Sequence, residues 1–447
     1  MKNVYSPGQS EATTRIDQNQ GVSAGRAAVL RALVLCSIGN AMEWFDWTCY
    51  AIFASYLAKN LFESGRDQSA LLSTLAVFAV GFIARPIGGI LFGRLADVRG
   101  RRYVMVATTV MMAVGSAVVG LIPSYSQFGV LSPTILVVAR LMQGLAHGGE
   151  GATSYPYICE IAPVRSRGLW SSVVFGAVSV GALVATGLGA LLTHLLSNEQ
   201  MLTWGWRIPF LGGSVLGVYA CFMRRGLVES KVFQESKNAP KGRSASQVKH
   251  GGRGFSGAVL LRLVTLSAGA SVTYYTWSAF ATAYATTAKG MSSGDAFVAS
   301  LGAQLVGLVA LPVCGALSDR FGRRILCIGF SAGFVILSFP LEWMLSSHPW
   351  TLFVSQSIAL SLWAMLTSIH PAVMTEQLPT GVRATAIGGI NSLSVAVFGG
   401  TAPFLGAFLS SRGVHFIFVL YVMALCLAAL VVSWCMPETK GIPLDEV

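Results

Sequence analysis

Charged residues are scarce in this sequence. Only 11% of the 447 residues are Asp, Glu, Lys or Arg, whereas 53% are hydrophobic and 49 are glycine. A soluble protein usually carries about a quarter charged residues. So little charge cannot cover a surface in water, and most of this surface is therefore expected to face lipid. The many glycines agree, because glycine lets membrane helices approach closely.

Several motifs are also absent. No G-x-x-x-x-G-K-[ST] loop occurs, which argues against an ATP-driven pump. No CxxC pair occurs, so neither a zinc site nor a disulfide framework is expected, and no cofactor or metal is predicted. The cysteines lie in or beside apolar stretches and are interpreted as small packing residues. No cleavable signal peptide is evident, because the first apolar run carries Glu43 and Asp46 and eleven more runs follow.

Apolar runs of about twenty residues predict membrane-spanning helices. Twelve such runs are expected, at residues 30–57, 70–92, 103–122, 134–158, 168–193, 206–224, 259–287, 295–317, 324–345, 350–375, 384–410 and 413–436. This number excludes a soluble enzyme, and no nucleophile–base constellation stands out. The predicted fold class is an all-α membrane protein.

The net charge of +12 is a feature of topology and does not indicate nucleic-acid binding. With both termini on one side, 24 of the 31 Lys and Arg residues fall on that side and five on the other. Arg85 and Arg140 lie inside spans. Positive residues concentrate on the cytoplasmic side of membrane proteins, so both termini are predicted to be cytoplasmic.

A polar segment divides the chain into two halves. The expected organisation is an N-terminal tail (1–29), a six-helix half (30–225), a cytoplasmic linker (226–258), a second six-helix half (259–436) and a C-terminal tail (437–447). The sequence GRLADVRGRR from Gly93 recurs 222 residues later as GALSDRFGRR from Gly315. Glu160, Pro163 and Arg167 likewise recur 216 residues later. Two unrelated motifs that repeat at similar offsets indicate internal duplication.

These motifs resemble those of the major facilitator superfamily. The G-x-L-x-D-x-x-G-R-R loop is its hallmark, and the segment from Arg140 to Gly144 is similar to its fourth-helix motif. Within it, the chain resembles the metabolite:proton symporters, through the segments 39–46, 85–94, 148–150, 204–210 and 398–400. The branch that carries α-ketoglutarate looks nearest, although relatives with the same motifs carry citrate, shikimate, proline or betaine.

The resemblance implies two pseudo-symmetric six-helix bundles that work by alternating access in the bacterial inner membrane. It implies proton-coupled symport of a small organic acid, such as α-ketoglutarate or a related di- or tricarboxylate. The expected partners are this anion, protons and the lipid bilayer, and family members are usually monomers.

The few charged residues inside the spans are candidates for function, because a charge in the membrane is costly unless it is paired or faces a cavity. Asp46 and Arg140 are placed about 24 Å and 27 Å from the cytoplasmic side at 1.5 Å per residue, so they are level. We predict that Asp46 accepts the proton and that Arg140 sets its pKa, with Glu43 as the alternative proton carrier. The alternative interpretation is a static ion pair. Arg85 and Glu150 are also level with each other and are expected to pair if their role is structural.

Arg85 is the predicted contact for the substrate carboxylate, because guanidinium binds carboxylate bidentately and stays charged. Tyr50 lies four residues after Asp46 on the same helical face. The other candidate substrate contacts are His147, Glu150, Tyr274, Tyr275, His370 and Asn391. His147 and Gly151 depart from the family pattern, and both would enlarge or re-polarise the pocket. Either histidine and either tyrosine could equally be an ordinary packing residue.

The repeated loop motifs are interpreted as a cytoplasmic gate. Asp97 and Asp319 stand at helix–loop junctions, where a carboxylate can cap a neighbouring helix and pair with arginine. The resemblance assigns Glu160, Arg167, Glu376 and Arg383 to the same latch. The remaining members are Gly93, Gly100, Arg101, Arg102, Gly315, Gly322, Arg323 and Arg324. The arginines are also expected to enforce topology.

Two other functions remain open at this point. A drug:proton antiporter typically carries a Gly-Pro pair in span five, where this chain has Gly176, Gly181 and Gly187 without proline. A membrane sensor without transport activity would not need the gate motifs or the Asp46–Arg140 pair. Both features favour symport.

Overall fold

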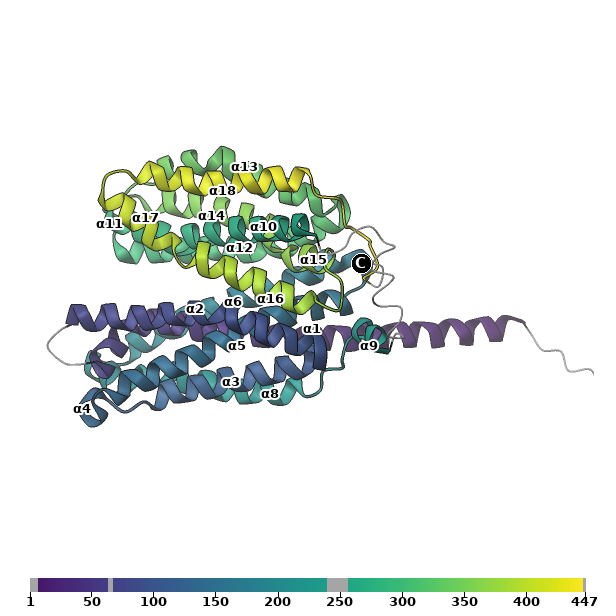
Figure 1. The fold of residues 1–447 in the computed structure, drawn as a ribbon, viewed down its shortest axis with the longest axis horizontal. Coiled ribbons are helices and arrows are strands. Elements are labelled where there is room, and N and C mark those ends of the chain that lie inside the picture. The colour runs from purple at the N-terminus through teal and green to yellow at the C-terminus, as the bar shows by residue number, and fades with distance from the viewer. Residues whose placement is uncertain (1–6, 63–66, 239–255, 445–447) are drawn as a thin grey trace, which may run out of the picture.

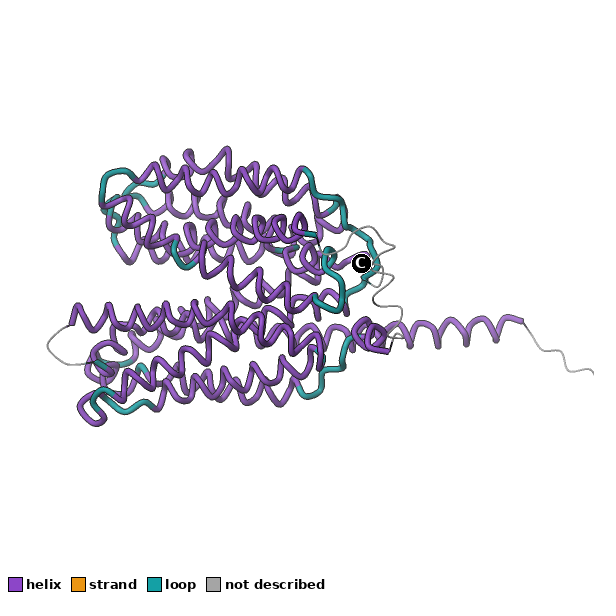
Figure 2. Tube along the Cα trace, in the orientation of Figure 1, coloured by secondary structure: helices purple, strands orange, loops and turns teal. Residues whose placement is uncertain are grey.

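The computed structural model describes residues 7–62, 67–238 and 256–444. Within these ranges the chain consists of helices joined by short loops, without a strand (Figures 1 and 2). The helices form two bundles that lie side by side, one from each half of the chain (Figure 1).

Six long helices build the N-terminal bundle. They are α1 (Pro7–Leu61), α2 (Asp67–Arg99), α3 (Arg101–Leu121), α5 (Leu131–Ile161), α6 (Arg167–Leu195) and α8 (Arg207–Arg224). Short elements connect them, namely α4 (Tyr125–Phe128), the 3₁₀ turn η1 (Val164–Ser166), α7 (Asn198–Gln200) and the π turn η2 (Met201–Gly205). Helix α1 therefore begins well before the span expected from residue 30, and its first part extends beyond the bundle (Figure 1).

The C-terminal bundle also has six spans, three of which are interrupted. The continuous helices are α12 (Ser293–Phe321), α13 (Arg323–Met344) and α18 (His415–Trp434). The interrupted spans are α10 (Gly257–Tyr275), η4 (Thr276–Phe280) and α11 (Ala281–Thr287); α14 (Pro349–Thr367) and α15 (His370–Thr375); and α16 (Arg383–Ser394), η5 (Val395–Gly399) and α17 (Ala402–Ser411). Pro371 explains the α14–α15 break, because proline has no N–H to donate to the preceding turn. The turns η4 and η5 are π-helical, a geometry that is common at functional sites.

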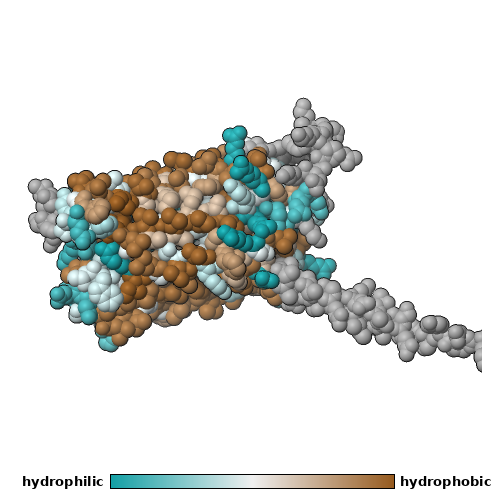
Figure 3. Space-filling view, turned by 90° about the horizontal axis from the view of Figure 1, so that it is seen from below, coloured by the Kyte–Doolittle hydropathy of each residue, from teal (hydrophilic) through white to brown (hydrophobic). Residues whose placement is uncertain are grey.

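Apolarity alone identifies only part of these spans. Among the described residues, eight helical segments are long and apolar enough to cross a membrane, and the bent pair that ends in α8 is a ninth. The other three helices, α1, α2 and α5, contain five buried charged residues, namely Glu43, Asp46, Arg85, Arg140 and Glu150. On the face of the molecule seen in Figure 3, a hydrophobic belt lies between more hydrophilic ends. The predicted all-α fold with two six-helix bundles is confirmed.

The two ends of the molecule differ. The arginine-rich loops around Gly100 and Gly322 lie at the end where the chain's C-terminus is found, and we call it the basic end. The opposite end, with α4 and α11, is called the far end (Figure 1). Helix α9 (Lys231–Asn238) lies at the basic end within the predicted linker 226–258, of which residues 239–255 lie outside the described ranges.

Close helix contacts hold the two halves together near the basic end. A Cβ atom on Gly89 of α2 would lie 2.3 Å from the carbonyl oxygen of Gly388 in α16. A Cβ atom on Gly315 of α12 would lie 2.7 Å from the carbonyl oxygen of Gly168 in α6. Only glycine permits these approaches, which explains part of the glycine content.

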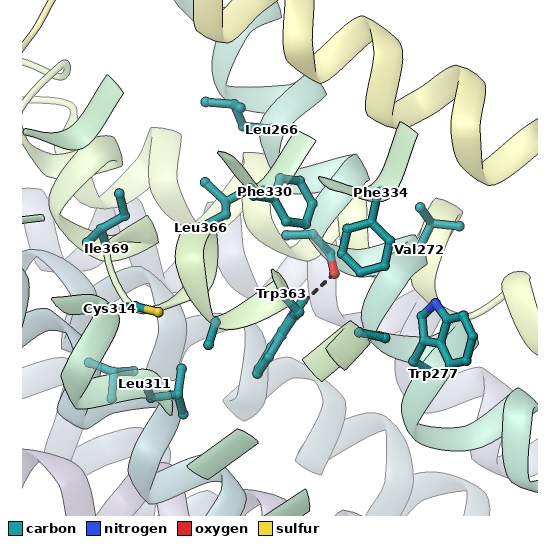
Figure 4. Close-up of a cluster of buried hydrophobic side chains, with 14 of the residues drawn as sticks. Leu266, Val272, Trp277, Leu311, Cys314, Phe330, Phe334, Trp363, Leu366 and Ile369 are labelled. Carbon is teal, nitrogen blue, oxygen red and sulfur yellow. Dashed lines mark hydrogen bonds between the residues drawn. The ribbon is translucent and has the colours of Figure 1, made fainter. Parts of the chain in front are cut away.

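The core of the C-terminal half reaches the boundary between the halves. Leu266, Phe330 and Phe334 belong to the same buried cluster as Trp363 of α14 and lie above it in Figure 4. The Trp363 indole N–H donates to the carbonyl of Ala270 in α10 at 3.1 Å. This hydrogen bond holds the indole ring in place. Trp363 also lines a central cavity between the two halves.

Candidate functional site

A central cavity of about 70 Å³ lies between the two halves. Residues of α1, α2, α5 and α6 form one wall, and residues of α10, α14, α15 and α16 form much of the other. Six of the eight predicted substrate contacts line it, namely Arg85, His147, Tyr274, Tyr275, His370 and Asn391. Glu43 and Gly151 line it as well.

Arg85 provides a buried positive charge at this cavity. Its side chain is enclosed by two aromatic rings, with the guanidinium carbon 4.0 Å from the Trp47 ring centre and 4.1 Å from that of Phe82. It donates a hydrogen bond to the Tyr275 hydroxyl from the other half, and its Nε atom has no partner in the described part of the chain. Arg85 also forms no ion pair within the described ranges. A desolvated cation without a carboxylate partner can bind an anion strongly.

Glu43 and His147 form a second polar group on the same wall. The Glu43 carboxylate contacts His147 Nδ1. The sequence analysis does not predict this pair. The His147 ring lies 5.7 Å from the Trp47 ring, edge to face. Two residues that were predicted for different roles, proton transfer and substrate contact, thus form one pair at the cavity.

The C-terminal wall is polar and aromatic. His370 Nε2 and the Ser267 hydroxyl are hydrogen-bonded at 2.8 Å. Asn391 is the hydrogen-bond partner of Tyr155, which joins the two halves across the cavity. Tyr274 lies between Trp363, at 4.7 Å between ring centres, and Trp44 of the other half, at 5.8 Å. These rings narrow the cavity from both sides.

Asp46 lies in a separate buried cluster inside the N-terminal bundle. Its carboxylate accepts hydrogen bonds from Arg140 at 3.0 Å and from Gln143 at 2.8 Å, and it also accepts one from Ser116. The predicted Asp46–Arg140 proximity is therefore found. Asp46 and Arg140 do not line the cavity.

Trp47 connects the two sites. Its ring centre lies 4.0 Å from the guanidinium carbon of Arg85 and 5.2 Å from that of Arg140. Gly81 makes room for the ring, because a Cβ there would lie 2.7 Å from the nearest indole carbon. One aromatic side chain therefore contacts both the cavity cation and the cation that pairs with Asp46.

Two predicted substrate contacts, Tyr50 and Glu150, do not lie at the cavity. Tyr50 does not line the cavity; its ring lies 3.7 Å from the Arg140 guanidinium carbon, and its hydroxyl donates to the carbonyl of Thr74 at 2.9 Å. Tyr50 and Asp46 lie on the same face of α1, and this face is directed toward Arg140 and away from the opposite half.

Glu150 does not line the cavity either, and its expected pairing with Arg85 is wrong. It accepts hydrogen bonds from both terminal nitrogens of Arg224, at 2.5 and 2.9 Å, and one from Thr108. Arg224 ends α8 and reaches back into the bundle past Gly39, where a Cβ would collide with its guanidinium. Its remaining bonds go to the carbonyls of Leu35, Cys36 and Met105 and to the Thr109 hydroxyl. The hydrogen bonds of Glu150 and Arg224 therefore all go to groups inside the N-terminal bundle.

The gate residues come together at the basic end. The Asp97 carboxylate accepts hydrogen bonds from the backbone N–H groups of Ala384 and Thr385, at 3.1 and 2.9 Å, and so caps α16 of the opposite half. Asp319 caps α6 in the same way, through the N–H groups of Gly168 and Leu169 at 2.8 Å each. An anion at a helix N-terminus satisfies free N–H groups and the helix dipole.

Crossed ion pairs accompany these caps. Glu160 pairs with Arg383 of the other half at 3.0 Å and with Arg101 of its own half at 3.3 Å. Glu376 pairs with Arg167 at 2.9 Å and with Arg323 at 3.4 Å. The hydrogen bonds and ion pairs found between the halves within the described ranges all lie at the cavity or nearer to the basic end.

No cluster of three or more His, Cys, Asp or Glu side chains with metal-binding geometry occurs among the described residues.

Comparison with known proteins identifies relatives over nearly the whole chain. The family model described as Major Facilitator Superfamily matches residues 36–388 and 266–444. The alpha-ketoglutarate permease of Escherichia coli (strain K12) is 34% identical over 97% of this chain and 99% of its own length. The citrate-proton symporter of Salmonella typhi is 29% identical over 85% and 87%, and the proline/betaine transporter of Escherichia coli (strain K12) is 29% identical over 93% and 84%.

A solved structure has a similar fold. The proton:xylose symporter XylE bound to 6-bromo-6-deoxy-D-glucose superposes with a TM-score of 0.81, at 19% identity, over 94% of this chain and 98% of that chain.

Proposed function

The chain belongs to the Major Facilitator Superfamily, and we propose that this membrane transporter carries a small organic acid together with protons. The proposed substrates are α-ketoglutarate or a related di- or tricarboxylate. Relatives at 34% and 29% identity carry names of this kind, and the cavity chemistry supports the assignment.

Arg85 carries this proposal. Arg85 forms no direct ion pair among the described residues, and Glu43, the one carboxylate that lines the cavity, is in contact with His147. Burying a guanidinium without a direct ion pair is costly, so this site is suited to a ligand that supplies a negative charge. A carboxylate can accept two parallel hydrogen bonds from a guanidinium, and the two flanking rings fix its plane. Polar groups on the opposite wall, including His370 and Asn391, can bind the rest of the acid.

Asp46 is the proposed proton acceptor. As a carboxylate it pairs with Arg140, and protonation would cancel that attraction and release the arginine. Trp47 would then transmit a shift of Arg140 to Arg85 at the cavity. Proton binding at one site and anion binding at the other would thus favour the same conformation, which is the requirement for coupling.

The basic end is proposed to be cytoplasmic, because 24 of the 31 Lys and Arg residues belong to that side in the predicted topology. The caps and crossed pairs then form a closed cytoplasmic gate. Substrate passage to the cytoplasm requires them to break, and their re-formation would return the cavity to the other side. Both termini would lie in the cytoplasm and the chain in the inner membrane, as a monomer.

A zwitterionic substrate is the second candidate. Glu43 places a carboxylate in the same cavity as Arg85, and Trp44, Tyr274 and Trp363 offer aromatic faces that suit a quaternary ammonium group. The proline/betaine transporter among the relatives has such substrates in its name. The contact between Glu43 and His147 favours the organic acid, because it engages the carboxylate that would otherwise bind the ligand cation.

Uptake into membrane vesicles tests the proposal. Labelled α-ketoglutarate, citrate, shikimate, proline and betaine would be supplied with an imposed proton gradient, with and without a protonophore. We expect a carboxylate to accumulate and its accumulation to collapse with the protonophore. Accumulation of betaine alone would select the second candidate, and carboxylate accumulation that ignores the protonophore would disprove proton coupling.

A further inference from the structure

A large basic pocket lies on the outside of the N-terminal bundle at the basic end. It has a volume of about 720 Å³, and α2, α3, α8 and α9 surround it. Arg99, Arg102 and Arg225 line it together with Tyr103 and Phe233. The three arginines are exposed, whereas Phe233 is buried. This pocket is separate from the central cavity.

An apolar groove begins where the pocket ends. The groove has a volume of about 460 Å³ and runs between α3 and α8. Val114 on α3 and Val218 on α8 line it and are 48% and 64% exposed. Arg225 lines both the pocket and the groove. The helices concerned lie on the face seen in Figure 3, where a hydrophobic belt meets hydrophilic residues at the basic end.

The positive charge of the pocket is available to a ligand. Glu229 is its one acidic lining residue, and its carboxylate already accepts hydrogen bonds from the backbone N–H groups of Arg101 and Arg102, at 3.1 and 3.2 Å. The Arg225 guanidinium has no hydrogen-bond or ion-pair partner within the described ranges. The Arg99 guanidinium is hydrogen-bonded to the Tyr103 hydroxyl at 3.4 Å and lies 5.5 Å from its ring centre, and it forms no ion pair in the described part of the chain.

The C-terminal half shows that the fold does not require these arginines. Its Glu438 accepts hydrogen bonds from the N–H groups of Arg323 and Arg324, just as Glu229 does from Arg101 and Arg102. Arg324 donates to the Trp434 carbonyl at 2.6 Å, as Arg102 does to the Arg225 carbonyl at 2.5 Å. At these equivalent positions Trp434 replaces Arg225, and Phe321, 222 residues after Arg99, replaces that arginine. Two of the three arginines are therefore specific to the N-terminal half.

We propose that this pocket and groove bind one anionic phospholipid. The phosphate lies between Arg99 and Arg225, and an acyl chain lies in the groove between α3 and α8. A basic pocket between helices at the membrane surface suits a phosphate headgroup. A soluble phosphate could use the arginines but would leave the groove empty, whereas a lipid uses both features.

Lipid binding to the purified full-length protein in an uncharged detergent tests the headgroup site. A fluorescent phosphatidylglycerol would be titrated into wild type and into an Arg99→Gln/Arg225→Gln double variant. About 1 kcal/mol per arginine near an anionic headgroup predicts a roughly thirtyfold weaker Kd for the double variant. The matched control is Arg94→Gln/Arg165→Gln, which removes two exposed arginines of the same end outside the pocket and should leave the Kd unchanged.

Two further measurements test whether an acyl chain occupies the groove and whether the bound phosphate belongs to a lipid. Val114→Trp fills the groove and should weaken lipid binding, whereas Val180→Trp, at a lipid-facing position of α6, should not. Glycerol phosphate, which lacks acyl chains, should compete poorly. If both arginine double variants lose the same lipid affinity, the loss follows from net charge alone, and the proposed headgroup site is overturned. Competition by glycerol phosphate as strong as that by the lipid, or no effect of Val114→Trp, would overturn the lipid as occupant.

Discussion

Replacement of Arg85 by glutamine tests the anion site most simply. Glutamine keeps a polar group that can reach the Tyr275 hydroxyl, but it removes the charge between the Trp47 and Phe82 rings. A hydrogen bond to a charged group contributes about 1.5–3 kcal/mol. Loss of this contact should therefore raise the KM for a carboxylate substrate by about 10- to 150-fold.

The assay is initial-rate uptake into vesicles over a range of substrate concentrations. Arg94→Gln is the control, because Arg94 is exposed at the basic end and does not line the cavity. Arg85→Lys should fall between wild type and Arg85→Gln, since a lysine keeps the charge but not the planar pair of donors.

A neutral amide analogue of the substrate separates charge recognition from general damage. If Arg85 recognises the carboxylate, the ratio of carboxylate to amide affinity should fall in Arg85→Gln, because the interaction energy belongs to the pair. Loss of uptake that is equal for both ligands would show a structural role. An unchanged KM for the carboxylate would refute the anion site.

Three further predictions follow from single contacts. Glu150→Gln leaves the buried Arg224 charge unpaired and should lower the free energy of unfolding by about 3–5 kcal/mol, measured by thermal unfolding in detergent; an unchanged midpoint would contradict the structural pair. Gly89→Ala places a Cβ 2.3 Å from a carbonyl oxygen of α16 and should stop net transport, whereas Gly187→Ala, which has open space around it, should not; equal uptake by the two variants would count against the close gate contact. Trp47→Leu removes the ring between the guanidinium groups of Arg85 and Arg140. At a fixed proton gradient it should lower the substrate accumulation ratio more than it lowers the rate of substrate exchange. A wild-type accumulation ratio would exclude Trp47 as the connection between the proton site and the cavity.

The sequence was sufficient for the fold and the gate because these depend on local and repeated signals. Apolar runs and the duplicated loop motif gave twelve spans in two halves. The caps formed by Asp97 and Asp319 followed from a carboxylate at a helix–loop junction beside a partner helix. Helix depth was also enough to bring Asp46 and Arg140 together, since both lie well inside their spans.

Contacts that depend on side-chain reach could not be predicted in the same way. Arg224 is the last residue of the span predicted at 206–224, a position typical of a charge at the membrane surface, but its long side chain enters the bundle beside Gly39 and binds Glu150. Helical periodicity places Asp46 and Tyr50 on the same face of their helix. It does not show that this face packs against Arg140. Gly39, like Gly81 beside Trp47, could have signalled that a large side chain crosses there, but only three-dimensional packing shows which one.

Proton coupling through Asp46 is the central claim, and one measurement tests it directly. Asp46→Asn keeps the size of the side chain and its contact with Ser116 while removing the titratable charge beside Arg140. Vesicles with this variant should still exchange labelled for unlabelled substrate, because exchange needs no net proton movement. They should fail to accumulate substrate when a proton gradient is imposed, whereas an exposed-site variant such as Arg94→Gln should accumulate normally. Protonophore-sensitive accumulation by Asp46→Asn at the wild-type level would contradict the account.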